Sequence, residues 1–282
     1  MSAGSGFAQE SALGRQAGEG QNDKFSVSLD DGCQVEAVWY PTGTLCLSTQ
    51  VGCAMGCPFC ASGRNGLLRS LGVEELHHQL ATARLRGHHI ERITLSGIGE
   101  PLQALTTVEA FVASVELPVS VTTSGQPLTA LKRFLMARHN GLMLSVHAGT
   151  AAVHRQLVPR GPDFEALWRL LAQQWPLLSR RRRRKIGINY LLLAGVNDTA
   201  EELAALTERL QGFPEITLHL LTWNPVEGQP WRSPGDATMA AVADGLRVQG
   251  LNVRLANRWR RQALGGCGTL VSQGQAARPG TA

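Results

Sequence analysis

The chain has 282 residues, of which 43% are hydrophobic and 17% charged, so it is long and apolar enough to bury one large core. No apolar run approaches the length of a membrane-spanning helix, and a net charge of +5 weakly favours a polyanionic partner such as nucleic acid. Clustered cysteines suit a reducing compartment, so we expect a cytoplasmic protein that makes no contact with membranes.

The first part of the chain predicts a small β element. Residues 1–23 hold few large apolar groups and no signal core, so we expect a disordered lead. Phe25–Leu29 and Gln34–Tyr40 alternate apolar and polar residues around Asp30-Asp31-Gly32, which predicts a β-hairpin element over 24–43. Thr44–Thr49 is the next predicted strand, and it leads into a loop rich in cysteine.

Helices and strands then alternate as far as about residue 255, and we assign residues 44–270 to one core domain and 271–282 to a disordered tail. The alternation predicts an α/β fold with a parallel sheet, closed or nearly closed, and right-handed crossovers. The predicted strands are Arg92–Leu95, Pro118–Thr122, Leu142–Val146, Ile186–Leu193, Ile216–Leu221 and Val253–Leu255. The predicted helices are Val73–Ala83, Leu105–Val115, Leu128–Ala137, Phe164–Leu178, Ala200–Gln211 and Ala237–Val248.

The unusual residues of the sequence directly follow these strands. Parallel sheets bind ligands at the carboxyl ends of their strands, where such loops meet. We therefore expect one site there, built from the cysteine loop, Gly97–Pro101, Thr122–Gly125, Ser145–His147 and Trp223–Pro225.

Cys53, Cys57 and Cys60 are spaced Cys-x3-Cys-x2-Cys. Three thiolates can hold a cluster of four irons and leave one iron open for a ligand. A zinc site completed by His77 or His78 and a disulfide knot are the alternatives. An iron-sulfur cluster is favoured because zinc knuckles pair Cys-x2-Cys with a second close pair, and the sequence has none.

The stretch Gly97-Ile98-Gly99-Glu100-Pro101 offers a close backbone approach and a carboxylate able to receive an ammonium group. In isolation it is also typical of a plain tight turn. Next to the cysteine loop it fits an enzyme in which an open iron chelates the methionine end of S-adenosylmethionine (SAM).

Motifs spread along the chain resemble the RlmN/Cfr family of radical SAM methyltransferases, which methylate RNA adenine on carbon. The resemblance covers about Phe25 to Leu270 and implies an incomplete parallel (β/α)6-type barrel. It is carried by Cys46-x6-Cys53-x3-Cys57-x2-Cys60, Gly97–Leu102, Thr123-Ser124-Gly125, Leu144–Ala148, Gly195–Asp198, Trp223-Asn224-Pro225 and Cys267-Gly268.

The resemblance assigns roles to individual residues. Cys53, Cys57 and Cys60 would hold a [4Fe-4S] cluster. The SAM site would be formed by Gly99, Glu100, Thr122, Ser145, Val146, His147 and Asn224.

The resemblance also implies the catalytic chemistry. Cys267 would be methylated on sulfur and would then carry the one-carbon unit to adenine as a radical. Cys46 would release the product by forming a transient disulfide with Cys267, and Glu36 would accept the ring proton. Without the family, the cysteines read as buried structural residues and Glu36 as an exposed strand carboxylate.

The implied partners are an RNA substrate, rRNA or tRNA, and an external electron donor such as flavodoxin, and we expect a monomer. Arg258, Arg260 and Arg261 precede Cys267 and are candidates for RNA phosphate contacts, as is the basic run 180–185. Such a run is also typical of a solvated face.

Two departures from the family leave the substrate open. Typical members carry a further N-terminal domain, where we expect only the polar lead here. They also have aspartates after an Arg-Gly pair before the last cysteine, where this chain reads 260–266 as RRQALGG. The alternatives are therefore a radical SAM enzyme acting on a peptide or small molecule, and a zinc-binding RNA module without catalysis.

Overall fold

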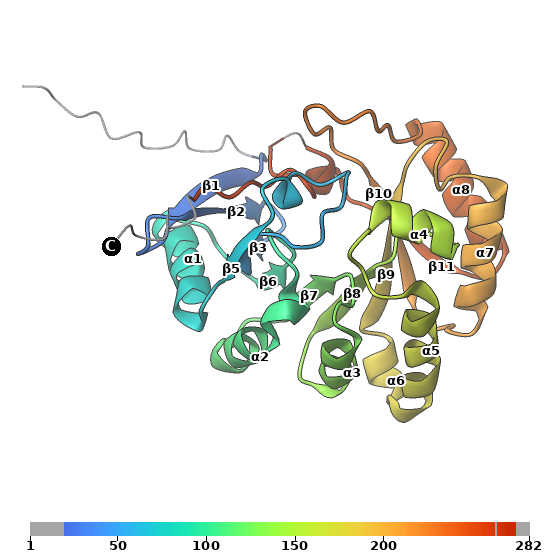
Figure 1. Ribbon diagram of the computed structural model, residues 1–282, viewed down its shortest axis with the longest axis horizontal. Helices are drawn as coiled ribbons and strands as arrows, with labels where there is room; N and C mark the ends of the chain where they lie inside the picture. Colours follow the sequence, from blue (N-terminus) through green and yellow to red (C-terminus); the bar gives the residue numbers. More distant parts are fainter. Residues whose placement is uncertain (1–19, 263, 275–282) are drawn as a thin grey trace, which may run out of the picture.

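A computed structural model describes residues 20–262 and 264–274, which form one α/β unit (Figure 1). Its main sheet has nine strands in the order β1-β2-β3-β6-β7-β8-β9-β10-β11. Neighbouring strands from β3 to β11 are parallel, whereas β1, β2 and β3 pair antiparallel. The strands are β1 (Asp23–Ser28), β2 (Gln34–Tyr40), β3 (Thr44–Leu47), β6 (Arg92–Leu95), β7 (Val119–Thr123), β8 (Gly141–Ser145), β9 (Ile186–Leu192), β10 (Thr217–Thr222) and β11 (Asn252–Leu255).

Helices cover the outer, convex side of this curved sheet (Figure 1). In α5, Phe164, Leu167 and Leu171 are buried on one face, and the Asp163 side chain accepts a hydrogen bond from the Ala166 N–H to cap the helix. The helices are α1 (Val73–Leu85), α2 (Leu105–Ser114), α3 (Leu128–Met136), α4 (Ala151–Leu157), α5 (Phe164–Gln174), α6 (Arg180–Arg183), α7 (Ala200–Gln211) and α8 (Asp236–Val248).

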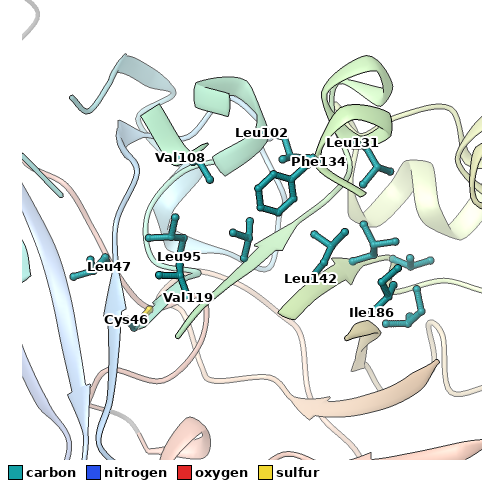
Figure 2. Packing of buried hydrophobic residues seen from close by; sticks show 14 of the residues in the cluster. Cys46, Leu47, Leu95, Leu102, Val108, Val119, Leu131, Phe134, Leu142 and Ile186 are labelled. Carbon is teal, nitrogen blue, oxygen red and sulfur yellow. The ribbon is translucent and has the colours of Figure 1, made fainter. Parts of the chain in front are cut away.

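The core lies between the sheet and these helices. Figure 2 shows Leu95 and Leu142 of the sheet against Val108 of α2 and Phe134 of α3, all fully buried. Packing of this kind explains why each βα unit returns to the same side of the sheet. It leaves the carboxyl ends of the strands free to carry loops.

The predicted α/β fold is confirmed, and the predicted elements fall close to the observed ones. The sequence did not predict the two-stranded sheet β4 (Gln50–Gly52) and β5 (Leu67–Ser70), nor the short helices α4 and α6. The helix predicted over Phe164–Leu178 ends at Gln174, and Trp175–Leu177 forms a separate 3-10 turn. Pro176 is the reason, because proline removes a backbone donor needed by a continuing α-helix.

Most of the predicted lead and tail, residues 1–19 and 275–282, lie outside the described residues. Within the described part, residues 20–22 precede β1, and Gln273 pairs with Gln34 in an isolated β-bridge. No helix among the described residues combines the length and the hydropathy needed to cross a membrane.

Candidate active site

The cysteine loop begins at the edge of the small β4–β5 sheet. Gly52 has a φ of 78°, and a Cβ at this position would lie 2.0 Å from the carbonyl oxygen of Gly66. That carbonyl accepts a hydrogen bond of 2.9 Å from the Cys53 N–H. Only glycine allows this close crossing, so Gly52 fixes the direction in which the loop leaves the sheet.

The three loop cysteines have free thiols, with Cys53 buried and Cys57 and Cys60 half-buried. Burial raises the pKa of Cys53 to about 11 and also raises those of Cys57 and Cys60. Buried thiols need a positive centre to become thiolates, and an iron cluster supplies one. The donor set therefore fits a [4Fe-4S] cluster.

A zinc site would need a fourth ligand beside the three cysteines, for which His77 and His78 are the candidates. The Nε2 of His77 is engaged elsewhere, since it lies 2.8 Å from the Ser114 hydroxyl, and His78 is exposed on α1.

Glu100 follows β6 and is fully buried. One carboxylate oxygen accepts hydrogen bonds from the Leu102 N–H and the Thr123 hydroxyl, and the other accepts from the Ser124 N–H and hydroxyl, both at 2.7 Å. Burial raises the pKa of Glu100, whereas these donors oppose that rise. Four donors match the acceptor capacity of a carboxylate, so a ligand ammonium must displace a hydroxyl to reach it.

Gly99 places the backbone next to Glu100 in a conformation with a φ of 112°. A Cβ at this position would lie 2.7 Å from Cβ of Gln50, whose Oε1 accepts a 2.8 Å hydrogen bond from the Glu100 N–H. The small sheet next to the cysteine loop thus also positions the Gly99–Glu100 loop. No local pattern in the sequence distinguishes Gln50 from an ordinary strand residue.

His147 follows β8 and is buried with a φ of 59°, which is rare for a residue with a side chain. Its Nδ1 accepts a hydrogen bond of 3.0 Å from the Leu191 N–H, and burial lowers its pKa to about 3. The ring is therefore neutral with its proton on Nε2. The ring stands perpendicular to that of Phe59, the neighbour of Cys60, with 5.2 Å between the ring centres.

The side chains of Thr122 on β7 and Ser145 on β8 are half-buried and are directed to the inside of the barrel. Each residue lies two positions after a residue, Ser120 or Met143, that lines a hollow inside the barrel, and residues two apart on a strand share one face. Val146 is fully buried, and its backbone oxygen lies 3.0 Å from Nδ1 of His154. Val146 can therefore contribute backbone rather than side-chain contacts.

Cys46, Cys60 and Cys267 line one small cavity of about 70 Å³. Cys46 lies on β3, and its sulfur is 3.2 Å from the Ser96 hydroxyl. Burial raises the pKa of Cys46 to about 11. The cavity therefore brings together Cys60 of the cysteine loop, the predicted methyl carrier Cys267 and the predicted resolving thiol Cys46.

Arg260 lies beside this cavity, and its Nη1 donates to Sγ of Cys267 at 3.4 Å. The guanidinium carbon is 5.7 Å from the centre of the Tyr40 ring. The Cys267 sulfur and Tyr40 both raise the pKa of Arg260. The side chain of Arg260 thus faces two cysteines and a tyrosine, and its contact with RNA phosphates stays a prediction.

Residues 258–268 form a segment, which we call the strap, that holds Cys267 over the barrel mouth. Asn224, which follows β10, donates through Nδ2 to the carbonyls of Arg260 and Cys267, both at 3.0 Å. The Tyr40 hydroxyl donates to Gly265 O at 3.0 Å, and the Ala61 N–H donates to Gly268 O at 2.8 Å. The Nδ2 group of Asn224 is thus engaged by the cysteine segment, which leaves its Oδ1 for a cofactor.

Glu36 of β2 contacts the chain just after this segment, at Val271, and does not line the cavity. One carboxylate oxygen accepts from the Val271 N–H at 2.8 Å, and the other pairs with Nζ of Lys24 at 2.8 Å. These two partners use half of the acceptor capacity of the carboxylate, so it can still accept a proton from a substrate that reaches it.

The neighbouring arginines have surface partners. Arg258 stacks over the Trp259 ring at 4.2 Å, and Arg261 forms an ion pair with Asp236. Tyr40 and Ser96 complete the cavity but were missed from the sequence, because nothing in their local pattern distinguishes them from ordinary strand and loop residues. Ser96 directly follows β6, which is the one signal that could have found it.

These features define an enzyme of the radical SAM class. Residues 47–210, more than half of the chain, match the model of the radical SAM superfamily. A [4Fe-4S] cluster and SAM are the cofactors of this class, and the donor set described above accommodates them.

The chain belongs to the RlmN-type family of radical SAM methyltransferases. The dual-specificity RNA methyltransferase RlmN of Halorhodospira halophila is 34% identical over 284 residues, which cover 95% of this chain and 78% of that protein. A "Probable RNA methyltransferase" of Thiobacillus denitrificans is 31% identical over 93% of this chain and 73% of its own length.

Solved structures agree with this assignment. A radical SAM methyltransferase from Sphaerobacter thermophilus superposes with a TM-score of 0.75 at 28% identity, covering 91% of this chain and 79% of that one. SuiB of Streptococcus suis bound to SAM, at 14% identity and a TM-score of 0.56 over 75% of this chain and 49% of its own, shares the fold.

Proposed function

We propose that this protein methylates a ring carbon of adenine in RNA, either rRNA or tRNA, through a methyl group carried on Cys267. The observation that carries the proposal is the shared cavity of Cys46, Cys60 and Cys267. Transfer of a methyl group in this way requires the carrier thiol of Cys267 and the resolving thiol of Cys46 to lie next to each other and next to the cysteine loop, here at Cys60. The RNA methyltransferases among the relatives support RNA as the substrate.

Cys53, Cys57 and Cys60 would hold the cluster, which when bound supplies the electron that cleaves SAM to a deoxyadenosyl radical. Glu100, His147 and the inward-facing Thr122 and Ser145 would bind and orient SAM, with backbone contacts from Gly99 and Val146 and side-chain contact from Asn224. The electron would come from an external protein donor of the flavodoxin type.

Within this proposal, Cys267 acts first as a nucleophile toward the methyl group of SAM and then as its carrier. Adenine carbons are too electron-poor to attack a methyl sulfonium directly, so the methyl carbon has to reach the ring as a radical. The radical adduct on Cys267 would return one electron to the redox centre of the enzyme and lose its ring proton to Glu36. The Cys46 thiolate would then attack the Cys267 sulfur and break the bond from that sulfur to the methylene carbon, which takes up a proton and becomes the methyl group of the product. The resulting disulfide is reduced by cellular thiols.

Trapping of the covalent intermediate tests the proposal. The Cys46→Ala variant should accumulate protein cross-linked to RNA through Cys267, visible as a nuclease-sensitive mass shift. The double variant Cys46→Ala/Cys267→Ala is the control and should carry no RNA. Protein purified from the single variant free of nucleic acid, with Cys267 unmethylated in peptide mass spectra, would refute the proposal.

A further inference from the structure

Three adjoining hollows lie at the end of the barrel opposite the cysteines. Their volumes are about 600, 500 and 360 Å³. The first lies among the amino-terminal ends of β6 to β10, shares Asn140 and Lys185 with the second, and shares Arg184, Thr217 and Arg254 with the third. Figure 1 shows α6, at their border, on the lower edge of the molecule, whereas the strap lies on the upper edge.

Cations dominate the lining of these hollows, and we call this region the basic end. Among the described residues only two carboxylates line it, Glu91 and Glu215, and Glu215 is engaged by Arg183 at 3.5 Å. The eight lining cations are Arg92, Arg138, Arg180, Arg181, Arg182, Arg184, Lys185 and Arg254.

Few of these cations are neutralised by the protein. Arg92 pairs with Glu91 at 3.6 Å, while Arg182 and Lys185 donate to backbone carbonyls next to α3. The other five make no side-chain hydrogen bond or ion pair with the described residues, and they are exposed; they are Arg138, Arg180, Arg181, Arg184 and Arg254.

The fold explains how the arginine run presents its charges. Ser179 caps α6 by accepting a hydrogen bond from the Arg182 N–H, and β9 begins at Ile186. Arg182 and Arg183 turn inward to carbonyls, including that of Trp175, so Arg180, Arg181 and Arg184 are directed to solvent. Hydrogen bonds within the protein thus explain Arg182 and Arg183, but they do not explain the three arginines that are directed to solvent.

The field of these cations also reaches buried groups. Burial and the cations Lys185 and Arg182 lower the pKa of His139 to about 4. Burial, Arg254 of the basic end and Arg260 from the side of the cysteines lower the pKa of His219 to about 4. Both histidines line the hollows. Uncompensated positive charge of this kind favours binding of an anion.

We propose that the basic end binds the phosphodiester backbone of the RNA substrate, away from the adenine that enters the opposite mouth of the barrel. This inference rests on the proposed function. Exposed arginines spread over several hollows suit a chain of phosphates better than a single one. The longest central strand, β9 with seven residues, gives a separation on the order of 20 Å between the two ends. The RNA that contacts both ends is therefore long or folded.

Charge reversal at the basic end tests the proposal. The triple variant Arg180→Glu/Arg184→Glu/Arg254→Glu changes only exposed side chains without protein partners. Arg84→Glu/Lys132→Glu/Arg169→Glu gives the same change in net charge at exposed helix positions elsewhere. Fluorescence anisotropy would measure the Kd of a folded RNA of tRNA size and of a ten-nucleotide oligomer containing adenine, as a function of salt.

The basic-end variant should bind the folded RNA at least tenfold more weakly, with a salt slope smaller by about 2 to 3. It should bind the short oligomer as the parent does, and the control triple variant should keep most of the affinity for both. A second basic-end variant with Gln at the three positions should show the same trend with a smaller loss, which guards against misfolding caused by the acidic residues.

Unchanged affinity of the basic-end variant for the folded RNA would overturn the inference, and so would full competition by inorganic triphosphate at micromolar concentration, which would assign a small-anion site. Failure of the proposed function is seen separately. In that case Cys46→Ala traps no RNA, whether or not the basic end binds it.

Discussion

The guanidinium of Arg260 lies 3.4 Å from the sulfur of Cys267, and it sits in a turn that begins only nine residues before that cysteine. Arg260 also interacts with Tyr40 and electrostatically with Cys46. A fixed positive charge stabilises a thiolate, which is the nucleophilic form of cysteine. Arg260 is therefore placed to hold the Cys267 sulfur and to support its negative charge.

Replacement of Arg260 by Gln should slow methylation of Cys267. A hydrogen bond to a charged group contributes about 1.5–3 kcal/mol, so the rate should fall roughly 10- to 100-fold. Mass spectrometry of the peptide that contains Cys267, after timed incubation with SAM, would measure this rate. Arg260→Lys should recover part of it by restoring the charge.

Arg258→Gln is the matched control, because Arg258 stacks on Trp259 and makes no contact with the cysteines. This variant should methylate Cys267 at the parental rate. Equal rates in Arg260→Gln and in the parent would show that the contact with sulfur has no chemical role.

Replacement of Gly52 by Ala should disrupt the cysteine loop. The new Cβ would meet Gly66 O at 2.0 Å in a left-handed backbone conformation, so the loop must shift. We expect a loss of at least about 2 kcal/mol in the free energy of unfolding and a clear loss of iron per chain. Chemical denaturation and iron analysis would measure both.

Gly66→Ala is the control for backbone strain alone. Gly66 has a φ of 70°, but a Cβ there would have no neighbour within 4 Å. It should cost about 1 kcal/mol and retain the iron. A Gly52→Ala protein with the parental iron content would contradict the close crossing.

The βα alternation could be predicted because its signals are local. The helical spacing of Leu76, Leu80 and Ala83 and the apolar runs of the strands depend on neighbouring residues only. The loop positions of Glu100 and His147 followed from the rule that loops after parallel strands share one edge. The structure places both residues at that edge.

The strap and the partners of the site could not be predicted in this way. Tyr40 reaches Gly265 across 225 residues, and Asn22 binds Trp259 O and Leu264 O across more than 230. Such contacts follow from the closure of the whole sheet and leave no periodic pattern in the sequence. The hydrogen bonds from the Thr123 and Ser124 hydroxyls to the Glu100 carboxylate could not be predicted either, because they depend on how the loops after two different strands meet.

Replacement of Asn224 by Ala should loosen the strap. The carbonyls of Arg260 and Cys267 lose a common donor, which costs about 1–3 kcal/mol where the groups are partly buried. Amide hydrogen exchange over residues 258–268 should become roughly 5- to 100-fold faster. Asn252→Ala, on the exposed face of β11, should leave this exchange unchanged.

The stability of the protein should fall in acid because of His139. Burial, together with Lys185 and Arg182, lowers its pKa in the folded state to about 4, whereas an ordinary histidine has a value of 6.5. The folded state therefore favours the neutral ring. This contribution to stability is complete above pH 6.5 and is lost as the pH falls toward 4, because the unfolded chain takes up the proton first.

His139→Phe should remove this dependence and keep the stack on Phe134, whose ring centre is 5.4 Å away. Relative to the parent, the variant should gain about 2 kcal/mol between pH 7.5 and pH 5, since one pKa unit corresponds to about 1.4 kcal/mol. Urea denaturation at the two pH values would measure the gain, and His78→Phe, at an exposed position of α1, serves as the control. A difference between variant and parent that stays constant with pH would mean that the pKa of His139 is the same in the folded and the unfolded protein.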